Sequence, residues 1–250
     1  MKIDCFFIPD NAVSGISEDD YERVTDIITT LKAYARLSFQ SIYVVDYFKK
    51  DFLYVSDNPL FLCGHQPSDL KKMGFDFYLK HVPQSEIDML LEINRAGFDF
   101  YQRRTIDDRT KLYISYDFHI MESGRKKLIN HKITPILLDP NGNVWLAVCV
   151  VSPSFNKQVG HLEAHKEKCV DYWVYSLKSH QWEQKSDVVL NETEKEILRL
   201  STQGYCEKEI AEIMSLNLNT LKKYKKHINK TLGAYNISSA IVIAHQKKLM

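Results

Sequence analysis

Long hydrophobic runs are missing from this sequence of 250 residues. The longest unbroken apolar run extends only from Val144 to Val151, whereas a membrane-spanning helix needs about 20 apolar residues. The N-terminal stretch from Met1 to Pro9 is also too short and too acidic for the apolar core of a signal peptide. The sequence therefore predicts a cytoplasmic protein with no membrane partner.

Paired cysteines are missing as well. The five cysteines are odd in number, widely scattered and never spaced as C-x-x-C. This pattern argues against a disulfide framework and against a cysteine zinc site, and it fits a reducing compartment. We expect most of them to be small buried apolar groups. They are Cys5, Cys63, Cys149, Cys169 and Cys206.

Catalytic motifs and metal-ligand clusters are scarce. The sequence has no glycine-rich phosphate loop and no nucleophile elbow, and the βαβ alternation of a phosphoacceptor domain is missing although Asp46 follows a predicted strand. A helix over residues 160–170 would place three metal-ligating side chains on one side, those of His161, His165 and Cys169. The lysines among them favour a polar connecting helix instead. We predict no metal site and no enzymatic activity.

Charge is nearly balanced over the whole chain but is divided unevenly. The formal net charge is +1, while the segment from Asn191 onward holds ten basic and six acidic residues. That segment is therefore basic and the preceding body is slightly acidic. A basic C-terminal piece on an acidic body is typical of a nucleic-acid-binding module joined to another domain.

Patterns in the first part of the chain predict a mixture of helices and antiparallel strands. Ser17 and the acids after it cap an amphipathic helix over residues 17–37, and β-branched and aromatic runs at 42–45 and 52–55 predict a hairpin. Short helical turns and one longer helix led by Pro83 follow. Further strands are predicted at Lys111–Met121, Leu128–Leu138 and Val144–Val151, and residues 172–177 with 181–183 predict one more strand or hairpin. Asn141-Gly142 is expected to be a hairpin turn and Ser179–Val189 the linker.

This order of elements resembles a PAS domain over residues 39–152. The resemblance depends on Ile42-Tyr43-Val44-Val45-Asp46, on Tyr54-Val55-Ser56-Asp57-Asn58 and on Gly64. It implies an antiparallel five-stranded sheet with helices on one face, used as a sensor or as a dimerisation module. We divide the chain into an N-terminal helical segment (1–38), a PAS-like domain with a C-terminal extension (39–185) and a further domain (188–250).

Aromatic residues are frequent in the PAS-like region and have two interpretations. Filling the hydrophobic core is the commoner use, and lining a cavity for a small-molecule ligand is the other. Haem held by His65 or His81 is a third idea, but lone histidines rarely hold haem, and the cofactor stays open. The aromatic residues are Phe75, Phe77, Tyr78, Phe98, Phe100, Tyr101, Tyr113, Tyr116, Phe118 and Trp145.

The last sixty residues predict a set of short helices. One begins near Asn191 and ends before Gly204, and a second covers residues 206–214. After a turn, Asn219 and Thr220 are expected to cap a third helix that runs to Leu232 and is closed by Gly233. Two short helices joined by such a turn form a helix-turn-helix arrangement.

The third of these helices has one apolar face and one cationic face. Residues 219–232 contain five lysines and no acid. At 100° per residue the apolar residues gather on one side and the cations on the other. The apolar residues are Leu221, Tyr224, Ile228 and Leu232, and the opposite face carries Lys222, Lys223, Lys226, His227 and Lys230. Such a helix can bury one side while it presents cations to phosphates and to the guanine acceptors of a major groove.

The C-terminal segment resembles the LuxR-type (GerE) helix-turn-helix family. The residues that carry the resemblance are the run from Leu190 to Leu198, Gln203-Gly204, Lys208-Glu209-Ile210-Ala211, Thr220-Leu221-Lys222, Ile228 and Leu232-Gly233. Two positions depart from the family pattern, Tyr224 where His is usual and Thr231 where Lys is frequent. The resemblance also implies that residues 238–244 belong to a fourth helix that dimerises.

The LuxR-type resemblance assigns contacts to individual residues. It implies base-edge contacts from Lys222, Lys223 and Lys226, and phosphate contacts from Lys208, Thr220 and Lys230. Asn219 is added as a further DNA-binding residue at the start of the same helix.

Together these patterns predict an α+β protein, with a PAS-like antiparallel sheet domain followed by an all-α four-helix LuxR-type domain. The function that fits them is a transcription regulator that binds double-stranded DNA as a homodimer. The alternative is a PAS-based sensory or scaffold protein whose C-terminal helices mainly bind protein.

Overall fold

The computed structural model describes residues 3–186, 188–247 and 249–250. The chain forms two compact units, with the boundary between Lys185 and Ser186. No helix in these ranges is both long enough and apolar enough to cross a bilayer.

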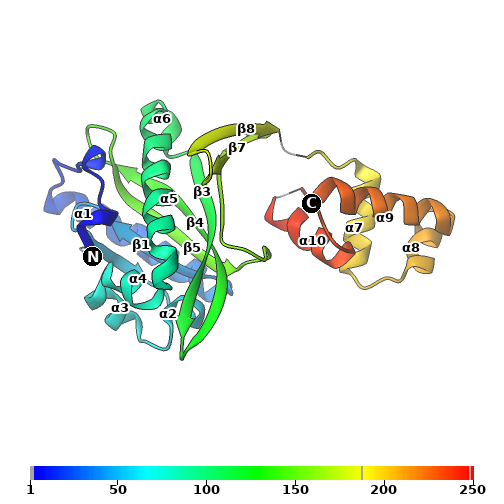
Figure 1. The fold of residues 1–250 in the computed structure, drawn as a ribbon, viewed down its shortest axis with the longest axis horizontal. Helices are drawn as coiled ribbons and strands as arrows, with labels where there is room; N and C mark the ends of the chain where they lie inside the picture. Colours follow the sequence, from blue (N-terminus) through cyan, green and yellow to red (C-terminus); the bar gives the residue numbers. More distant parts are fainter. Residues whose placement is uncertain (1–2, 187, 248) are drawn as a thin grey trace. The chain divides into compact units, whose positions relative to one another are not determined.

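An eight-stranded sheet forms the centre of the N-terminal unit (Figure 1). The strands are β1 (Ser41–Asp46), β2 (Asp51–Val55), β3 (Leu112–Glu122), β4 (Arg125–Leu138), β5 (Val144–Pro153), β6 (Gly160–Lys166), β7 (Asp171–Ser176) and β8 (Gln181–Ser186). Their order across the sheet is β2-β1-β5-β4-β3-β6-β7-β8, and the pairings among β1 to β7 are antiparallel. The first five strands make the PAS-like antiparallel sheet, and the last three extend it at the β3 edge.

Helices cover both faces of this sheet. They are α1 (Glu18–Leu37), α2 (Pro59–Leu62), α3 (Pro67–Met73), α4 (Asp76–His81), α5 (Gln84–Gln102) and α6 (Ile106–Arg109), preceded by two 3-10 turns at Ile3–Phe6 and Pro9–Asn11. On β1, Tyr43 and Val45 enter the main core with α3, α4 and α5, because alternate residues of a strand point to opposite faces. Val44 points the other way and packs with Val24 of α1.

Helix α1 belongs to the N-terminal segment outside the PAS-like range 39–152, and it covers the second face of the sheet. The sequence correctly predicts the helix itself: Ser17 Oγ accepts a hydrogen bond from the Asp20 amide, and the Asp20 side chain completes a capping box. Its one fully buried residue, Val24, packs against Trp145 and Leu146 of β5. Because α1 covers apolar residues on the second face, the sheet is buried on both sides at β1 and β5.

The two predicted hairpins are confirmed. β1 pairs with β2, and β4 pairs with β5. At the second turn the carboxylate of Asp139 accepts hydrogen bonds from the amides of Asn141 (2.9 Å) and Asn143 (2.8 Å). Gly142 has a φ of +83°, and a Cβ there would lie 2.8 Å from Ile106, so the turn needs glycine.

The predicted helix over residues 160–170 is wrong, because Gly160–Lys166 is strand β6 and pairs with β3. A spacing of four residues keeps side chains on one face of a strand as well as of a helix. The spacing of His161 and His165 therefore could not distinguish a strand from a helix. The partner strand lies far away in the sequence and supplies the hydrogen bonds that decide the conformation. The predicted linker Ser179–Val189 is also mostly wrong, since Gln181–Ser186 forms β8.

The C-terminal unit contains four helices around a core of its own (Figure 1). They are α7 (Glu192–Thr202), α8 (Glu207–Ile213), α9 (Leu218–Leu232) and α10 (Ile237–Gln246). The fully buried side chains come from every helix and from the segment before α7: Leu190, Ile197, Leu198, Leu200, Ile210, Ala211, Leu221, Ile228, Leu232, Ala240 and Ala244. The mixed α+β fold with an all-α C-terminal domain is the predicted one.

Candidate nucleic-acid interface and interior cavity

The ends of α9 are fixed by two different caps. The side chain of Asn217 accepts a hydrogen bond from the Thr220 amide (2.8 Å), so Asn217 is the N-cap. The expectation that Asn219 and Thr220 cap the helix is wrong, since both already lie inside its first turn. At the other end Gly233 adopts the left-handed conformation, with a φ of +65°, as predicted.

The apolar face of α9 holds the helix against its neighbours. Leu221, Ile228 and Leu232 are buried, and Tyr224 is half-buried against the same core. Tyr224 therefore packs in the domain interior at a position where the family pattern has His. Thr231, the second departure, is also half-buried. The position where Lys is frequent in the family therefore does not lie on the fully exposed face of α9.

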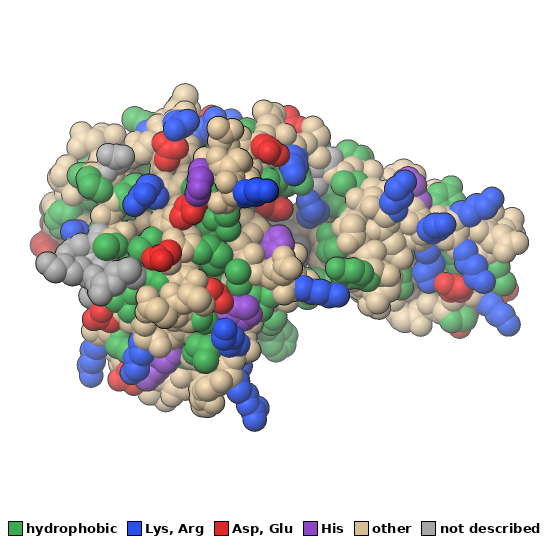
Figure 2. All heavy atoms as spheres, viewed as in Figure 1, with side chains coloured by type: hydrophobic (Ala, Val, Ile, Leu, Met, Phe, Trp, Pro, Cys, Tyr) green, Lys and Arg blue, Asp and Glu red, His purple; other side chains and the backbone are tan. Residues whose placement is uncertain are grey.

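The cationic face of α9 is exposed. Lys222, Lys223, Lys226 and Lys230 all lie at the surface, and in the ranges that the structure describes none of them forms an ion pair with a carboxylate. Figure 2 shows several Lys and Arg side chains on the visible surface of this unit. An exposed row of cations that forms no ion pair with a described carboxylate can bind phosphates.

Lys225 behaves differently from the other lysines of α9. Its ammonium lies 2.9 Å from the Glu207 carboxylate of α8, and its side chain is only 17% exposed. The hydrogen bond from Lys225 lowers the pKa of Glu207 below its ordinary value. This ion pair joins the two helices of the helix-turn-helix, whose connecting turn covers residues 214–217.

The remaining predicted site residues lie on these two helices. Lys208 is exposed in the first turn of α8, Asn219 is exposed in the first turn of α9, and Thr220 is half-buried beside it. Six of the seven predicted residues thus share α9. His227 was placed on the cationic face by the sequence but was not counted among the site residues. In the structure its Nδ1 lies 2.6 Å from the carboxylate of Glu194 on α7.

The N-terminal unit contains two neighbouring cavities between the sheet and α5. Their volumes are about 40 Å³ and about 30 Å³, and they share Tyr47, Asn94, Tyr116 and Ile133 in their walls. Each is large enough for at least one water molecule. Five of the aromatic residues line these cavities, namely Phe75, Tyr78, Phe98, Tyr101 and Tyr116. Phe77, Phe100 and Phe118 are buried in the core.

A buried polar chain lies in the wall of the second cavity. The Tyr43 hydroxyl is hydrogen-bonded both to the Tyr78 hydroxyl and to Nε2 of His131. Burial lowers the pKa of His131 to about 3, so its imidazole is neutral near pH 7. Nδ1 of His131 has no hydrogen-bond partner among the described residues. A buried nitrogen without a partner beside a cavity can bond to a polar molecule that enters it.

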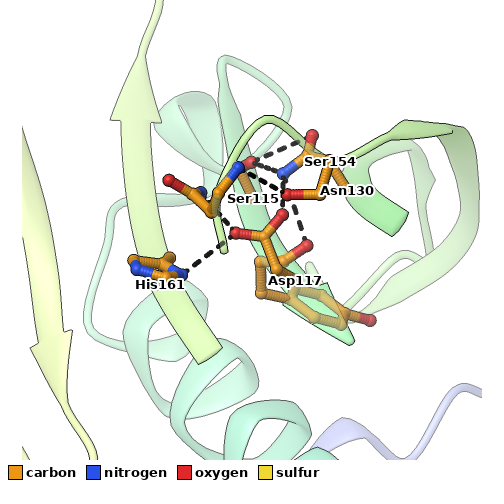
Figure 3. A network of polar contacts seen from close by, with 7 residues as sticks. Ser115, Asp117, Asn130, Ser154 and His161 are labelled. Carbon is orange, nitrogen blue, oxygen red and sulfur yellow. Dashed lines mark hydrogen bonds and ion pairs between the residues drawn. The ribbon is translucent and has the colours of Figure 1, made fainter. Parts of the chain in front are cut away.

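A second polar network connects β3, β4 and β6 (Figure 3). The fully buried carboxylate of Asp117 accepts hydrogen bonds from the side-chain amides of Asn130 (3.1 Å) and Asn156 (2.6 Å). Nδ1 of His161 lies 3.2 Å from the same carboxylate, which raises the pKa of His161. The network satisfies a buried charge at the bulge where β6 joins the sheet.

The other predicted ligand histidines are engaged with protein groups. Nε2 of His65 and Nε2 of His81 lie 3.0 Å apart, and Nδ1 of His81 bonds to the Met121 carbonyl. His165 pairs with Glu163 on its own strand. Among the described residues no group of three or more His, Cys, Asp or Glu side chains is arranged to hold a metal ion.

The geometry of the C-terminal unit is that of a helix-turn-helix domain with a cationic, exposed second helix. Residues 188–244 match the family model described as bacterial regulatory proteins, luxR family. The C-terminal unit is thus a LuxR-type helix-turn-helix domain, and the recognition made from the sequence is confirmed.

Comparisons with solved structures give weaker likenesses. A VqmA dimer of Vibrio cholerae, solved in the absence of target DNA and described among LuxR-type receptors, is 15% identical, with 88% of each chain covered and a TM-score of 0.35. A VqmA–ligand–DNA complex from the same organism is 13% identical over 88% of this chain and 87% of that one (TM-score 0.34). The PAS domain of Bordetella pertussis BvgS is 14% identical over 53% and 89% (TM-score 0.34). A search of curated protein sequences found no match.

Proposed function

We propose that the protein is a sequence-specific transcription regulator that binds double-stranded DNA through α9. In this proposal Lys222, Lys223 and Lys226 contact base edges in the major groove. Phosphates are contacted by Lys208, Asn219, Thr220 and Lys230. The observation that carries the proposal is the row of exposed, unpaired lysines on the second helix of a LuxR-type helix-turn-helix domain. Such a regulator would act in the cytoplasm, where bacterial DNA lies, and it would need no catalytic group.

Selection from a pool of random DNA duplexes tests sequence specificity. The wild-type protein should enrich one sequence over successive rounds, and a variant with Lys222, Lys223 and Lys226 all replaced by Gln should enrich none. Lys225→Gln is the matched control, because its side chain already pairs with Glu207. Equal enrichment by the wild type and the triple variant would contradict the assigned base contacts.

We also propose that the regulator binds DNA as a homodimer, with α10 as the dimerisation element that the LuxR-type family implies. A dimer places two recognition helices on a two-fold DNA site. Native mass spectrometry should find a species of twice the 29.2 kDa chain. A protein that stays monomeric both alone and on DNA would overturn this part of the proposal.

We infer further that the N-terminal unit senses a small molecule in the two neighbouring cavities. Support comes from the free Nδ1 of His131 and from the aromatic walls around it. Ile133→Phe would narrow both cavities, since Ile133 lines each of them. Native mass spectrometry of the wild type should show a retained molecule that this variant loses while its circular dichroism is unchanged. Equal retention in both proteins would place the ligand elsewhere.

A further inference from the structure

The imidazole of His227 lies on the cationic face of α9, and its Nδ1 contacts a buried carboxylate of α7. Its Nδ1 is 2.6 Å from Oε1 of Glu194, and the two side chains are 64% and 4% exposed. His227 is in the second half of the helix, where Lys223 and Lys230 are its neighbours at four and three residues along the same face.

Glu194 can act only as an acceptor in this contact. Its second oxygen accepts a hydrogen bond from the Asn191 amide (2.9 Å), as part of the capping box that starts α7. An ionised carboxylate has no hydrogen to donate. Nδ1 of His227 must therefore carry the hydrogen in this contact, whatever the charge of the ring.

The fixed Nδ1–H determines what the outer nitrogen can do. In the neutral ring the exposed Nε2 is a lone pair, which cannot donate to a phosphate oxygen. In the protonated ring Nε2 carries a hydrogen and the side chain is a cation. Lys230, three residues further along the same face, is a proposed phosphate contact, so His227 is placed within reach of the sugar-phosphate backbone.

We propose that His227 donates a hydrogen bond from Nε2 to a DNA phosphate only in its protonated form, so that this contact strengthens DNA binding as the pH falls. This inference depends on the proposed DNA binding by α9. The charged groups around His227 are Glu194 from α7 and Lys223, Lys226 and Lys230 from α9 itself. On α8, Glu207 is paired with Lys225, and on α10 the one titratable residue is His245, which is exposed.

Fluorescence anisotropy with a labelled duplex of random sequence, measured between about pH 6 and pH 8, tests the proposal. The wild-type affinity should fall as the pH rises, because the slope of log K against pH gives the number of protons taken up. His227→Gln keeps an amide that can donate to Glu194 but cannot become charged, so its affinity should be nearly independent of pH. His227→Lys should bind tightly at both ends of the range.

A second variant tests the role of the buried acid. Glu194→Gln offers its own amide hydrogen to Nδ1, which lets the neutral ring carry its hydrogen on Nε2 and donate to phosphate. Its affinity should therefore depend less on pH than that of the wild type. Circular dichroism at both pH values checks that each variant is folded.

The outcomes separate this inference from the proposed function. If the wild type binds DNA and His227→Gln retains the same slope against pH, the proton-linked contact is wrong and DNA binding stands. If the wild type binds no duplex at either pH, the proposed function fails and this inference fails with it.

Discussion

At the scale of single residues, Asp117 is a fully buried carboxylate whose partners come from strands β4 and β6 and from the loop between β5 and β6. His161 is its one partner that can change charge. His161 also has a φ of +48°, a left-handed conformation that few non-glycine residues adopt, although Asn, Asp and His do so more often than others. In this conformation the imidazole lies 3.2 Å from the buried charge.

The His161–Asp117 pair predicts a pH dependence of stability. The contact raises the pKa of His161 in the folded state above its unfolded value. The pair therefore stabilises the fold at low pH, and this stabilisation is lost as the pH rises through the folded-state pKa. Because His161 is partly exposed, we expect up to about 1 kcal/mol.

His161→Asn is the variant that measures it, because Asn tolerates a positive φ and its amide can donate to Asp117. The difference in melting temperature between wild type and variant should shrink from about pH 6 to about pH 8. A constant difference over that range would show that proton binding by His161 does not contribute to stability.

The cap of α9 gives a second prediction at this scale. Asn217→Ala removes the side-chain acceptor of the Thr220 amide and should destabilise the C-terminal unit by about 1 kcal/mol. Asn219→Ala, two residues later and without a capping hydrogen bond, should have a much smaller effect. Urea unfolding followed by circular dichroism compares them, and equal losses would contradict the assignment of Asn217 as the cap.

At the scale of elements, the lysines of α9 fall into two groups. Lys225 forms an ion pair with Glu207 of α8, and the other lysines form no ion pair with a described carboxylate. Lys230→Ala should lower the slope of log K for DNA against log salt by about 0.9 per protomer, the value for one lost phosphate contact. The free energy of unfolding should hardly change, because Lys230 is exposed.

Lys225→Ala is the matched control for that measurement. It breaks the ion pair with Glu207 that joins the two helices, so it should reduce stability and leave the salt slope almost unchanged. The opposite result, a steep loss of slope for Lys225 and none for Lys230, would mean that α9 presents another face to DNA.

Elements with strong local signals could be predicted from the sequence. β-branched and aromatic runs predicted β1 and β2, the Asn141-Gly142 turn predicted the hairpin of β4 and β5, and the lysine and apolar faces predicted α9. β6 was mistaken for a helix, because its conformation depends on pairing with β3 across the sheet. The partner of His227 was missed for a similar reason, since Glu194 lies 33 residues earlier in the chain. Contacts between distant segments leave no local pattern.

The cavities of the N-terminal unit could also be predicted only in part from the sequence. Their aromatic walls could be listed from the sequence as either core or lining, but the unpaired Nδ1 of His131 appears only when β1, β4 and α4 are brought together. Neither could the sequence foresee that α1 covers the second face of the sheet, because an amphipathic helix fits any apolar surface.

At the scale of the whole molecule, the chain forms two compact units, and each has one of the two proposed functions, sensing a small molecule or binding DNA. The N-terminal unit holds the cavities, and the C-terminal unit holds the exposed lysines. The separation predicts that Ile133→Phe, which alters only the cavity walls, should leave binding to a random-sequence duplex unchanged while retention of a small molecule is lost. Anisotropy and native mass spectrometry on the same sample check both, and loss of random-sequence binding would show that the units are coupled.

The central claim is that α9 neutralises DNA phosphates and reads bases with its free lysines. The most direct test is the salt dependence of duplex binding by the wild type and by the variant with Lys222, Lys223, Lys226 and Lys230 replaced by Gln. One proposed phosphate contact and three proposed base contacts per protomer are removed, so the slope of log K against log salt should become shallower by about 0.9 per protomer, with preference for the selected sequence abolished. An unchanged slope and an unchanged preference would contradict the account.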